Sequence, residues 1–178
     1  FCENQLWSFN GAIPKAGTIA DLNIASKILC RDTLLYALQG NHFIYYHNAP
    51  QYWTRAMTFA PYFWNERDGE QLSTQIKTLA LPTTTFAKAT CATLNSSLFY
   101  WWFIALSDCR HLNMREIDRF PLGLEEMSAV LLAKLENLCD RLMRDFKKHA
   151  KRKNCTYKAT GKVSYDEYFP RHSKPIMD

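Results

Sequence analysis

Basic residues gather in one tract of the chain, where they could contact the phosphates of a nucleic acid. Between Arg141 and Lys162 there are nine lysine and arginine residues against a single carboxylate, Asp145. The tract therefore carries +8 and the remainder of the chain −3, within an overall net charge of +5. Dense positive charge attracts a phosphate backbone and releases its counterions. The same composition is typical of a solvated helix end followed by a flexible linker, so both interpretations stand.

Side chains that could hold a metal or perform catalysis are scattered. The five histidines do not show metal-ligand spacing, and the sequence has no GxGxxG, P-loop, GxSxG or HExxH motif. The cysteines form no CxxC pair and no Cys/His cluster, which favours free thiols and a cytoplasmic location. These cysteines are Cys2, Cys30, Cys91, Cys109, Cys139 and Cys155. We expect no metal site and no bound cofactor.

The stretch from Thr84 to Leu122 predicts a helical hub for the fold. Apolar positions recur every three or four residues, so one helix face must be buried. These positions are Phe86, Thr90, Leu94, Leu98, Trp101 or Trp102, and Ala105. Thr83–Thr85 offers N-cap residues, and Asn113 with Glu116 forms a capping pair that opens a second short helix. The apolar run 98–106 is about nine residues, far short of the roughly 20 that span a membrane.

Short strands are predicted before this hub. Phe43–Tyr46 and Tyr52–Met57 are rich in aromatic and β-branched residues and are separated by a turn at Asn48–Pro50. Ser73–Ala80 is a third candidate strand. Ala20–Leu38 fits either a helix or a strand. The first residue is Phe1 and no leader pattern follows it, so we expect a fragment of a longer protein.

A long amphipathic helix is expected over residues 123–153, followed by a basic linker and tail over 154–178. Its leucine stripe either packs on its own domain or pairs with another chain or domain. Self-association would use Leu131, Leu135, Leu138 and Leu142.

Three segments carry a likeness to a known family: Ala92–Trp102, Ser107–Asn113 and Arg115–Pro121. Tyr45–Tyr46, Gln51–Ala56, Pro61–Phe63 and Tyr168–Ile176 add to it in order and spacing. Together they resemble the C-terminal region of type II restriction-modification DNA methylases. In that family this region is the target-recognition, or specificity, domain of an N6-adenine methyltransferase, related to the recognition domains of type I specificity subunits.

The resemblance implies an α+β fold, in which a small mixed or antiparallel sheet packs with helices over residues 1–122 and a long helix follows. It implies sequence-specific recognition of double-stranded DNA, which this domain positions for a catalytic domain of the same parent chain. The parent would use S-adenosylmethionine, and the sequence leaves open whether it is also a restriction endonuclease. The glycine-rich loop and the Asn/Asp-Pro-Pro-aromatic motif of such an enzyme are absent here, so we expect this fragment to be non-catalytic.

Under this resemblance, candidate base-reading residues are Arg55, Arg67, Lys77, Arg110 and His111. Candidate phosphate contacts are Lys147, Lys148, Lys151, Arg152 and Lys153. Tyr52 and Trp53 could stack on a base or belong to the core. Each base-reading candidate could equally be a surface charge or half of a structural salt bridge. Two other functions stay open: a helical assembly module of the same system, and RNA binding.

Overall fold

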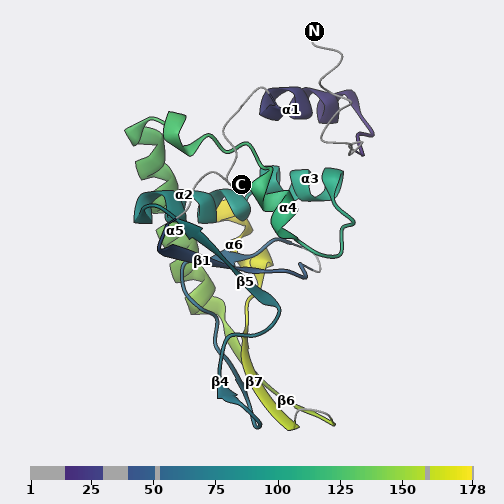
Figure 1. The fold of residues 1–178 in the computed structure, drawn as a ribbon, viewed down its shortest axis with the longest axis vertical. Coiled ribbons are helices and arrows are strands. Elements are labelled where there is room, and N and C mark those ends of the chain that lie inside the picture. Colours follow the sequence, from purple (N-terminus) through teal and green to yellow (C-terminus); the bar gives the residue numbers. More distant parts are fainter. Residues whose placement is uncertain (1–14, 30–39, 51–52, 159–160, 178) are drawn as a thin grey trace.

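The computed structural model describes residues 15–29, 40–50, 53–158 and 161–177. Within these residues the chain forms six α-helices and two antiparallel sheets (Figure 1). The expected α+β fold class with a long helix toward the C-terminus is confirmed. No helix in the described part is long and apolar enough to cross a membrane.

The first sheet lies in the body of the molecule and has the order β2-β1-β5. It consists of β1 (His42–His47), β2 (Ala56–Met57) and β5 (Ile76–Leu81). In β1 Ile44 and Tyr46 are buried whereas Phe43 is exposed, so one face of the strand packs into the core. The strand predicted at 43–46 is confirmed. The other two are shorter or shifted, and Tyr52 lies outside the described residues.

The predicted hub is two helices rather than one, α2 (Thr84–Leu94) and α3 (Ser97–Leu106). The hydroxyl of Ser96 accepts a hydrogen bond from the Phe99 N–H at 3.2 Å and so caps the start of α3. Because a new helix begins here, α2 ends before Ser96. The break turns Leu98 away from the core, and 44% of this residue is exposed. The predicted Thr83 cap of α2 is present.

The short helix α4 (Met114–Asp118) begins where the capping pair predicted it. The Glu116 carboxylate accepts the Asn113 N–H at 2.9 Å. The segment Ala20–Leu38 fitted either a helix or a strand, and its first part is helical, in α1 (Ile19–Leu29). Residues 30–38 of that segment lie outside the described part. A single 3-10 turn at Leu124–Glu126 leads toward the long helix.

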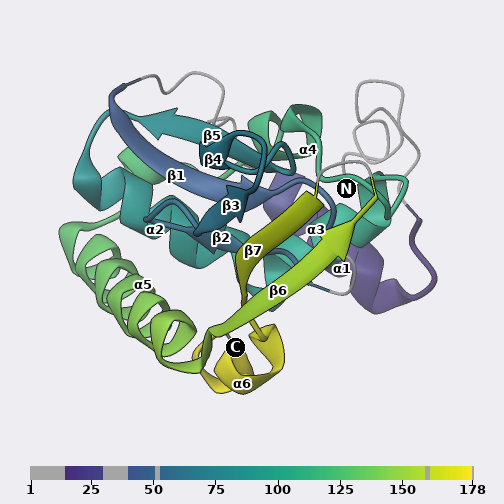
Figure 2. The ribbon, with the colours of Figure 1, turned by 90° about the horizontal axis from the view of Figure 1, so that it is seen from below.

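The long helix α5 (Ala129–His149) packs against α2, and Figure 2 shows it on the flank opposite α1. Its buried residues are Cys139, Leu142, Met143 and Phe146, so the C-terminal half of the leucine stripe docks on its own chain. The helix α6 (Pro170–Met177) packs on α5 and is held there by the Ser173 hydroxyl, which donates to Asp145. The four cysteines in the described part are free thiols.

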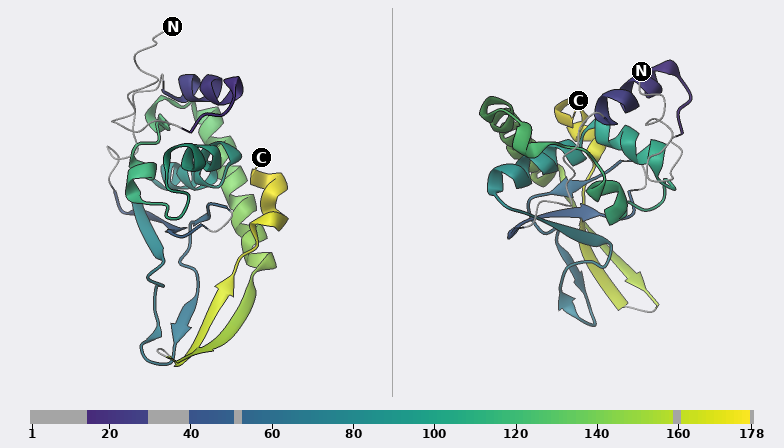
Figure 3. Two further views of the ribbon diagram at one scale, coloured as in Figure 1. Left: turned by 90° about the vertical axis from the view of Figure 1, so that its right-hand side faces the viewer. Right: turned by 45° about the horizontal axis from the view of Figure 1, so that its top comes forward.

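The second sheet projects from the body as an arm made of two hairpins (Figure 1; Figure 3, left). Its order is β4-β3-β7-β6, from β3 (Phe63–Asn65), β4 (Gly69–Glu70), β6 (Lys151–Tyr157) and β7 (Gly161–Glu167). The prediction of a linker and tail over residues 154–178 is therefore wrong, because a hairpin and a helix occupy this region. The long helix ends before residue 153 because Ala150 is extended, with φ −61° and ψ 140°.

Candidate nucleic-acid interface

Arg67 lies at the tip of the arm, in the turn between β3 and β4. Asn65 shapes this turn, because its side-chain oxygen accepts the Asp68 N–H at 2.7 Å and its amide donates to the Asp68 carboxylate at 3.2 Å. Arg67 Nε lies 3.6 Å from Asp68 Oδ1, and 79% of the arginine side chain is exposed. The guanidinium is thus both loosely oriented and accessible.

The tips of the two hairpins are joined to each other. The Glu66 N–H donates to the Lys162 carbonyl at 2.8 Å, and the Lys162 N–H donates to the Glu66 carboxylate at 2.9 Å. Gly161 has φ +70°, and a Cβ there would collide with that carboxylate. Strand pairing of β3 with β7 continues the connection along the arm. The two hairpins therefore form one unit.

The edge strand β6 carries two of the predicted phosphate contacts, and both are ion-paired with the neighbouring strand. The Arg152 guanidinium contacts both carboxylate oxygens of Asp166, at 2.5 and 3.3 Å, and lies 3.6 Å from the centre of the Tyr62 ring. Lys153 Nζ lies 3.4 Å from Glu167 Oε2. Their charge is partly neutralised by β7, so their share in attracting a phosphate is reduced.

The other three predicted phosphate contacts form a basic root where α5 meets β6: Lys147, Lys148 and Lys151. Lys147 Nζ lies 4.5 Å from the centre of the Phe59 ring, and Lys151 Nζ lies 5.4 Å from that of Phe169. No carboxylate in the described part of the chain forms an ion pair with these lysines. The basic root therefore keeps its positive charge.

Arg55 and Lys77 do not share the position of Arg67. Arg55 is half-buried beside the arm, its guanidinium donates to the Tyr168 carbonyl at 3.3 Å, and burial lowers its pKa. Lys77 is exposed on β5 in the body, where it pairs with Tyr46. Arg55 thus has a structural contact, whereas the Lys77 side chain faces solvent.

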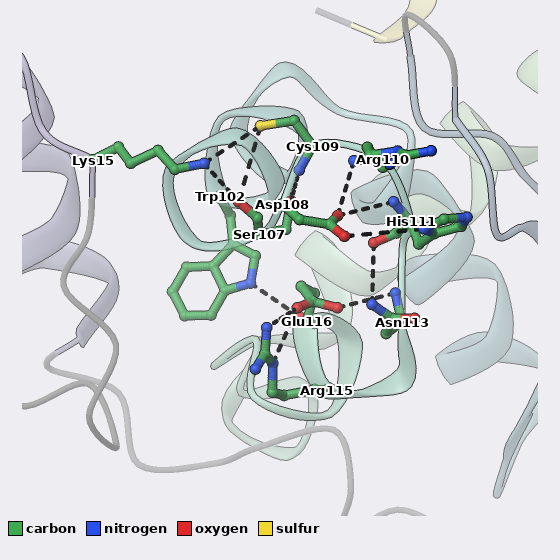
Figure 4. Close-up of polar contacts among 10 residues, drawn as sticks. All are labelled: Lys15, Trp102, Ser107, Asp108, Cys109, Arg110, His111, Asn113, Arg115 and Glu116. Atoms are coloured by element: carbon green, nitrogen blue, oxygen red, sulfur yellow. Dashed lines mark hydrogen bonds and ion pairs between the residues drawn. The ribbon is translucent and has the colours of Figure 1, made fainter.

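Arg110 and His111 lie in the loop between α3 and α4 (Figure 4). The Asp108 carboxylate accepts the N–H of His111 at 3.0 Å and that of Arg110 at 2.9 Å, and these bonds lower its pKa. The Leu112 N–H then anchors the loop to the Asn48 carbonyl at 2.8 Å. Both candidates therefore belong to an ordered loop of the body, not to the arm.

A cavity of about 490 Å³ between the arm and the body sheet was not predicted from the sequence. Four tyrosines in or next to the two hairpins line it on the side of the arm: Tyr62, Tyr157, Tyr165 and Tyr168. His47 is also in its wall, and burial, helped by the charge of Arg55, lowers the histidine pKa to about 4. The signal in the sequence that could have indicated this cavity was the tyrosine content of the two hairpins. Without knowledge of how the hairpins pair, these tyrosines did not indicate a common site.

Comparison of the chain with protein-family models, curated proteins and solved structures found no match. The fold and the arm define the class: an α+β protein that presents a two-hairpin arm with a basic root.

Proposed function

We propose that this chain is a DNA-recognition module whose arm enters the major groove of a duplex. The observation that carries the proposal is the arm itself, which extends from the body with Arg67 at its tip and the basic root at its other end (Figure 3, left). The major groove of B-form DNA is about 12 Å wide and admits a two-stranded β-ribbon. The β3–β4 hairpin is such a ribbon and carries Arg67 in its turn, so it is the part of the arm that enters the groove, while the basic root lies at the start of the other hairpin.

Two kinds of contact follow from the positions of the cations. The basic root contacts phosphates, which provides affinity without sequence preference. Arg67 reaches base edges, because an arginine can donate two hydrogen bonds to O6 and N7 of guanine. Arg152 and Lys153 stiffen the hairpin through their ion pairs with β7. Affinity and specificity are therefore assigned to separate parts of the arm.

The likeness to the C-terminal region of adenine-specific methylases supports a place for this module in a restriction-modification enzyme. The catalytic domain of the parent chain would bind S-adenosylmethionine and act on an adenine turned out of the duplex. The present chain would hold that duplex in position.

The test compares Arg67→Ala with Lys134→Ala, a matched change of an exposed cation on α5 away from the arm. The full chain is used to select from a pool of random duplexes, and bound sequences are counted. Arg67→Ala should lose about 1–3 kcal/mol of preference at one base pair while retaining general affinity. Lys134→Ala should select the same sequences as the wild type. An unchanged preference in Arg67→Ala would contradict the assignment of this residue.

A second candidate function is assembly through the leucine stripe. A groove of about 560 Å³ runs along α5 and is lined by Leu131, Leu135, Leu138 and Leu142 together with apolar residues of α1. Leu131 is 43% exposed and its neighbour Val130 is 67% exposed. Sedimentation equilibrium of the wild type and Leu131→Lys tests it: a dimer that the substitution dissociates supports assembly, and a monomer at all concentrations excludes self-association.

A further inference from the structure

A second cavity lies where the segment before β2 and the end of β7 meet the start of α6. Its volume is about 410 Å³, within the range of roughly 300–1,000 Å³ that small-molecule sites occupy. Trp53 and Tyr168 provide aromatic surface, and the charged residues of the wall are Arg55, Glu167, Arg171 and Lys174. We call it the Trp53 cavity. None of the basic-root lysines lines it.

The charge of this cavity favours an anion. Among the described residues of its wall there are three cations and one carboxylate, and the carboxylate of Glu167 is also engaged by Lys153 at 3.4 Å. Arg171 and Lys174 are three residues apart on α6, so their side chains leave the same face of the helix. Both residues are exposed. Arginine and lysine side chains in such an arrangement bind phosphate through charge-assisted hydrogen bonds.

The aromatic surface is held in place. The Trp53 indole N–H donates to the Asn95 carbonyl at 3.1 Å, and Tyr100 stacks on the indole with ring centres 4.4 Å apart. Lys174 Nζ lies 5.1 Å from the centre of the Trp53 ring. A cation and a fixed π-surface are therefore within reach of one ligand. The flexible lysine stem allows the ammonium to turn from the ring to a phosphate.

We propose that the Trp53 cavity binds a single nucleotide, with the base against Trp53 and the phosphate between Arg171 and Lys174. Stacking on an aromatic side chain favours a base of any identity, because every base has a π-face. The nucleotide could be free or could be an unstacked residue of a DNA strand, since the recognised chemistry is the same. Duplex binding by the arm does not require this cavity, so the two proposals succeed or fail separately.

The first experiment titrates the full chain with deoxyadenosine monophosphate in a calorimeter, with deoxyadenosine and inorganic phosphate as partial ligands. Saturable binding is expected, with the nucleotide bound at least about tenfold more tightly than either part. The double variant Arg171→Gln/Lys174→Gln should weaken nucleotide binding by about tenfold or more, and Trp53→Leu should weaken it as well. Trp53→Phe should recover part of the loss, because a ring remains. Lys134→Gln, an exposed cation on α5 outside the cavity, should bind like the wild type.

The second experiment distinguishes the two sources of the nucleotide with a short single strand, a fully paired duplex and a duplex containing one bulged nucleotide. Tighter binding of the bulged duplex than of the paired one, lost in Arg171→Gln/Lys174→Gln, assigns the cavity to a strand nucleotide. Equal binding of the two duplexes together with saturable mononucleotide binding assigns it to a free nucleotide. The proposal is overturned if the double variant changes the binding of no probe. It is also overturned if inorganic phosphate binds as tightly as the nucleotide.

Discussion

At the scale of single residues, the five predicted phosphate contacts fall into two groups according to whether they form an ion pair with β7. Arg152 lies directly opposite Asp166 in the antiparallel register, and Lys153 reaches Glu167 diagonally. Such cross-strand pairs contribute about 0.2–1 kcal/mol each. Of the basic-root lysines, Lys147 and Lys148 lie on α5, and Lys151 lies opposite Glu167 in the register but forms no ion pair with it, since Lys153 engages that carboxylate. A count of charges along the sequence treats both groups alike, because it contains no information on the pairing of β6 with β7.

His47 provides a prediction on pH. Burial lowers its pKa from 6.5 to about 4, so the unfolded chain binds a proton more readily than the folded chain between these values. The stabilisation from the neutral imidazole is complete above about pH 6.5 and is lost as the pH falls toward 4. At about 1.4 kcal/mol per pKa unit, the free energy of unfolding should fall by about 3 kcal/mol between pH 7 and pH 4.

Urea unfolding at pH 7, 5 and 4 measures this effect in the wild type and in His47→Gln, which cannot titrate. The variant should lose less stability on acidification than the wild type does. Identical acid sensitivity of the wild type and His47→Gln would show that another group is responsible.

At the scale of elements, the junction between α2 and α3 connects the helices to the body sheet. Asn95 is fully buried, and its amide donates to the carbonyls of Cys91 at 2.8 Å and Ala56 at 2.9 Å. Its side-chain oxygen accepts the Ala56 N–H at 3.2 Å. One side chain thus ends a helix and pairs with strand β2.

Replacing this side chain should be costly. Asn95→Ala leaves the buried N–H and C=O of Ala56 without these partners, and each unsatisfied group costs about 1–3 kcal/mol. We expect a loss of about 2–4 kcal/mol in the free energy of unfolding, measured by chemical denaturation. Asn137→Ala, on the exposed face of α5, should change it by less than about 0.5 kcal/mol. A small loss in Asn95→Ala would mean that the junction does not depend on its side chain.

Elements with local signals were predictable, and those held by distant partners were not. The capping pair Asn113 and Glu116 marked α4 because both residues lie within one turn of the chain. The α2–α3 break was missed because apolar spacing continued across Ser96, although Asn-Ser-Ser is itself a capping signal. The hairpin of β6 and β7 was missed because β6 is almost wholly exposed and has no apolar alternation.

The candidate site was predicted in part for the same reason. The sequence identified Arg67 in a loop and the lysines in a basic tract, but it could not indicate that β3 pairs with β7. That pairing joins segments about a hundred residues apart and creates the arm. Arg110, His111 and Lys77 were base-reading candidates on the same sequence-based grounds as Arg67. The fold places them on the body instead.

At the scale of the whole molecule, the body and the arm divide the work that we propose. The core made by α2, α5 and the body sheet holds the root of the arm, since only Ala150 separates the last turn of α5 from β6. The basic root is therefore fixed to the most extensive helix of the fold. Arg67 at the other end depends on the two linked hairpins. Phosphate contact and base reading are consequently expected to respond differently to mutation.

The salt dependence of duplex binding tests the central claim most directly. The affinity of the full chain for a duplex is measured across a range of salt concentrations, for the wild type and for Lys147→Gln/Lys148→Gln/Lys151→Gln. If these lysines bind phosphates, the slope of log affinity against log salt should flatten by about 0.9 for each phosphate no longer neutralised, while sequence preference is retained. The pair Arg152→Gln/Lys153→Gln should flatten it less, because Asp166 and Glu167 already engage these cations. An unchanged slope in the triple variant, or no binding of any duplex at low salt, would contradict the account.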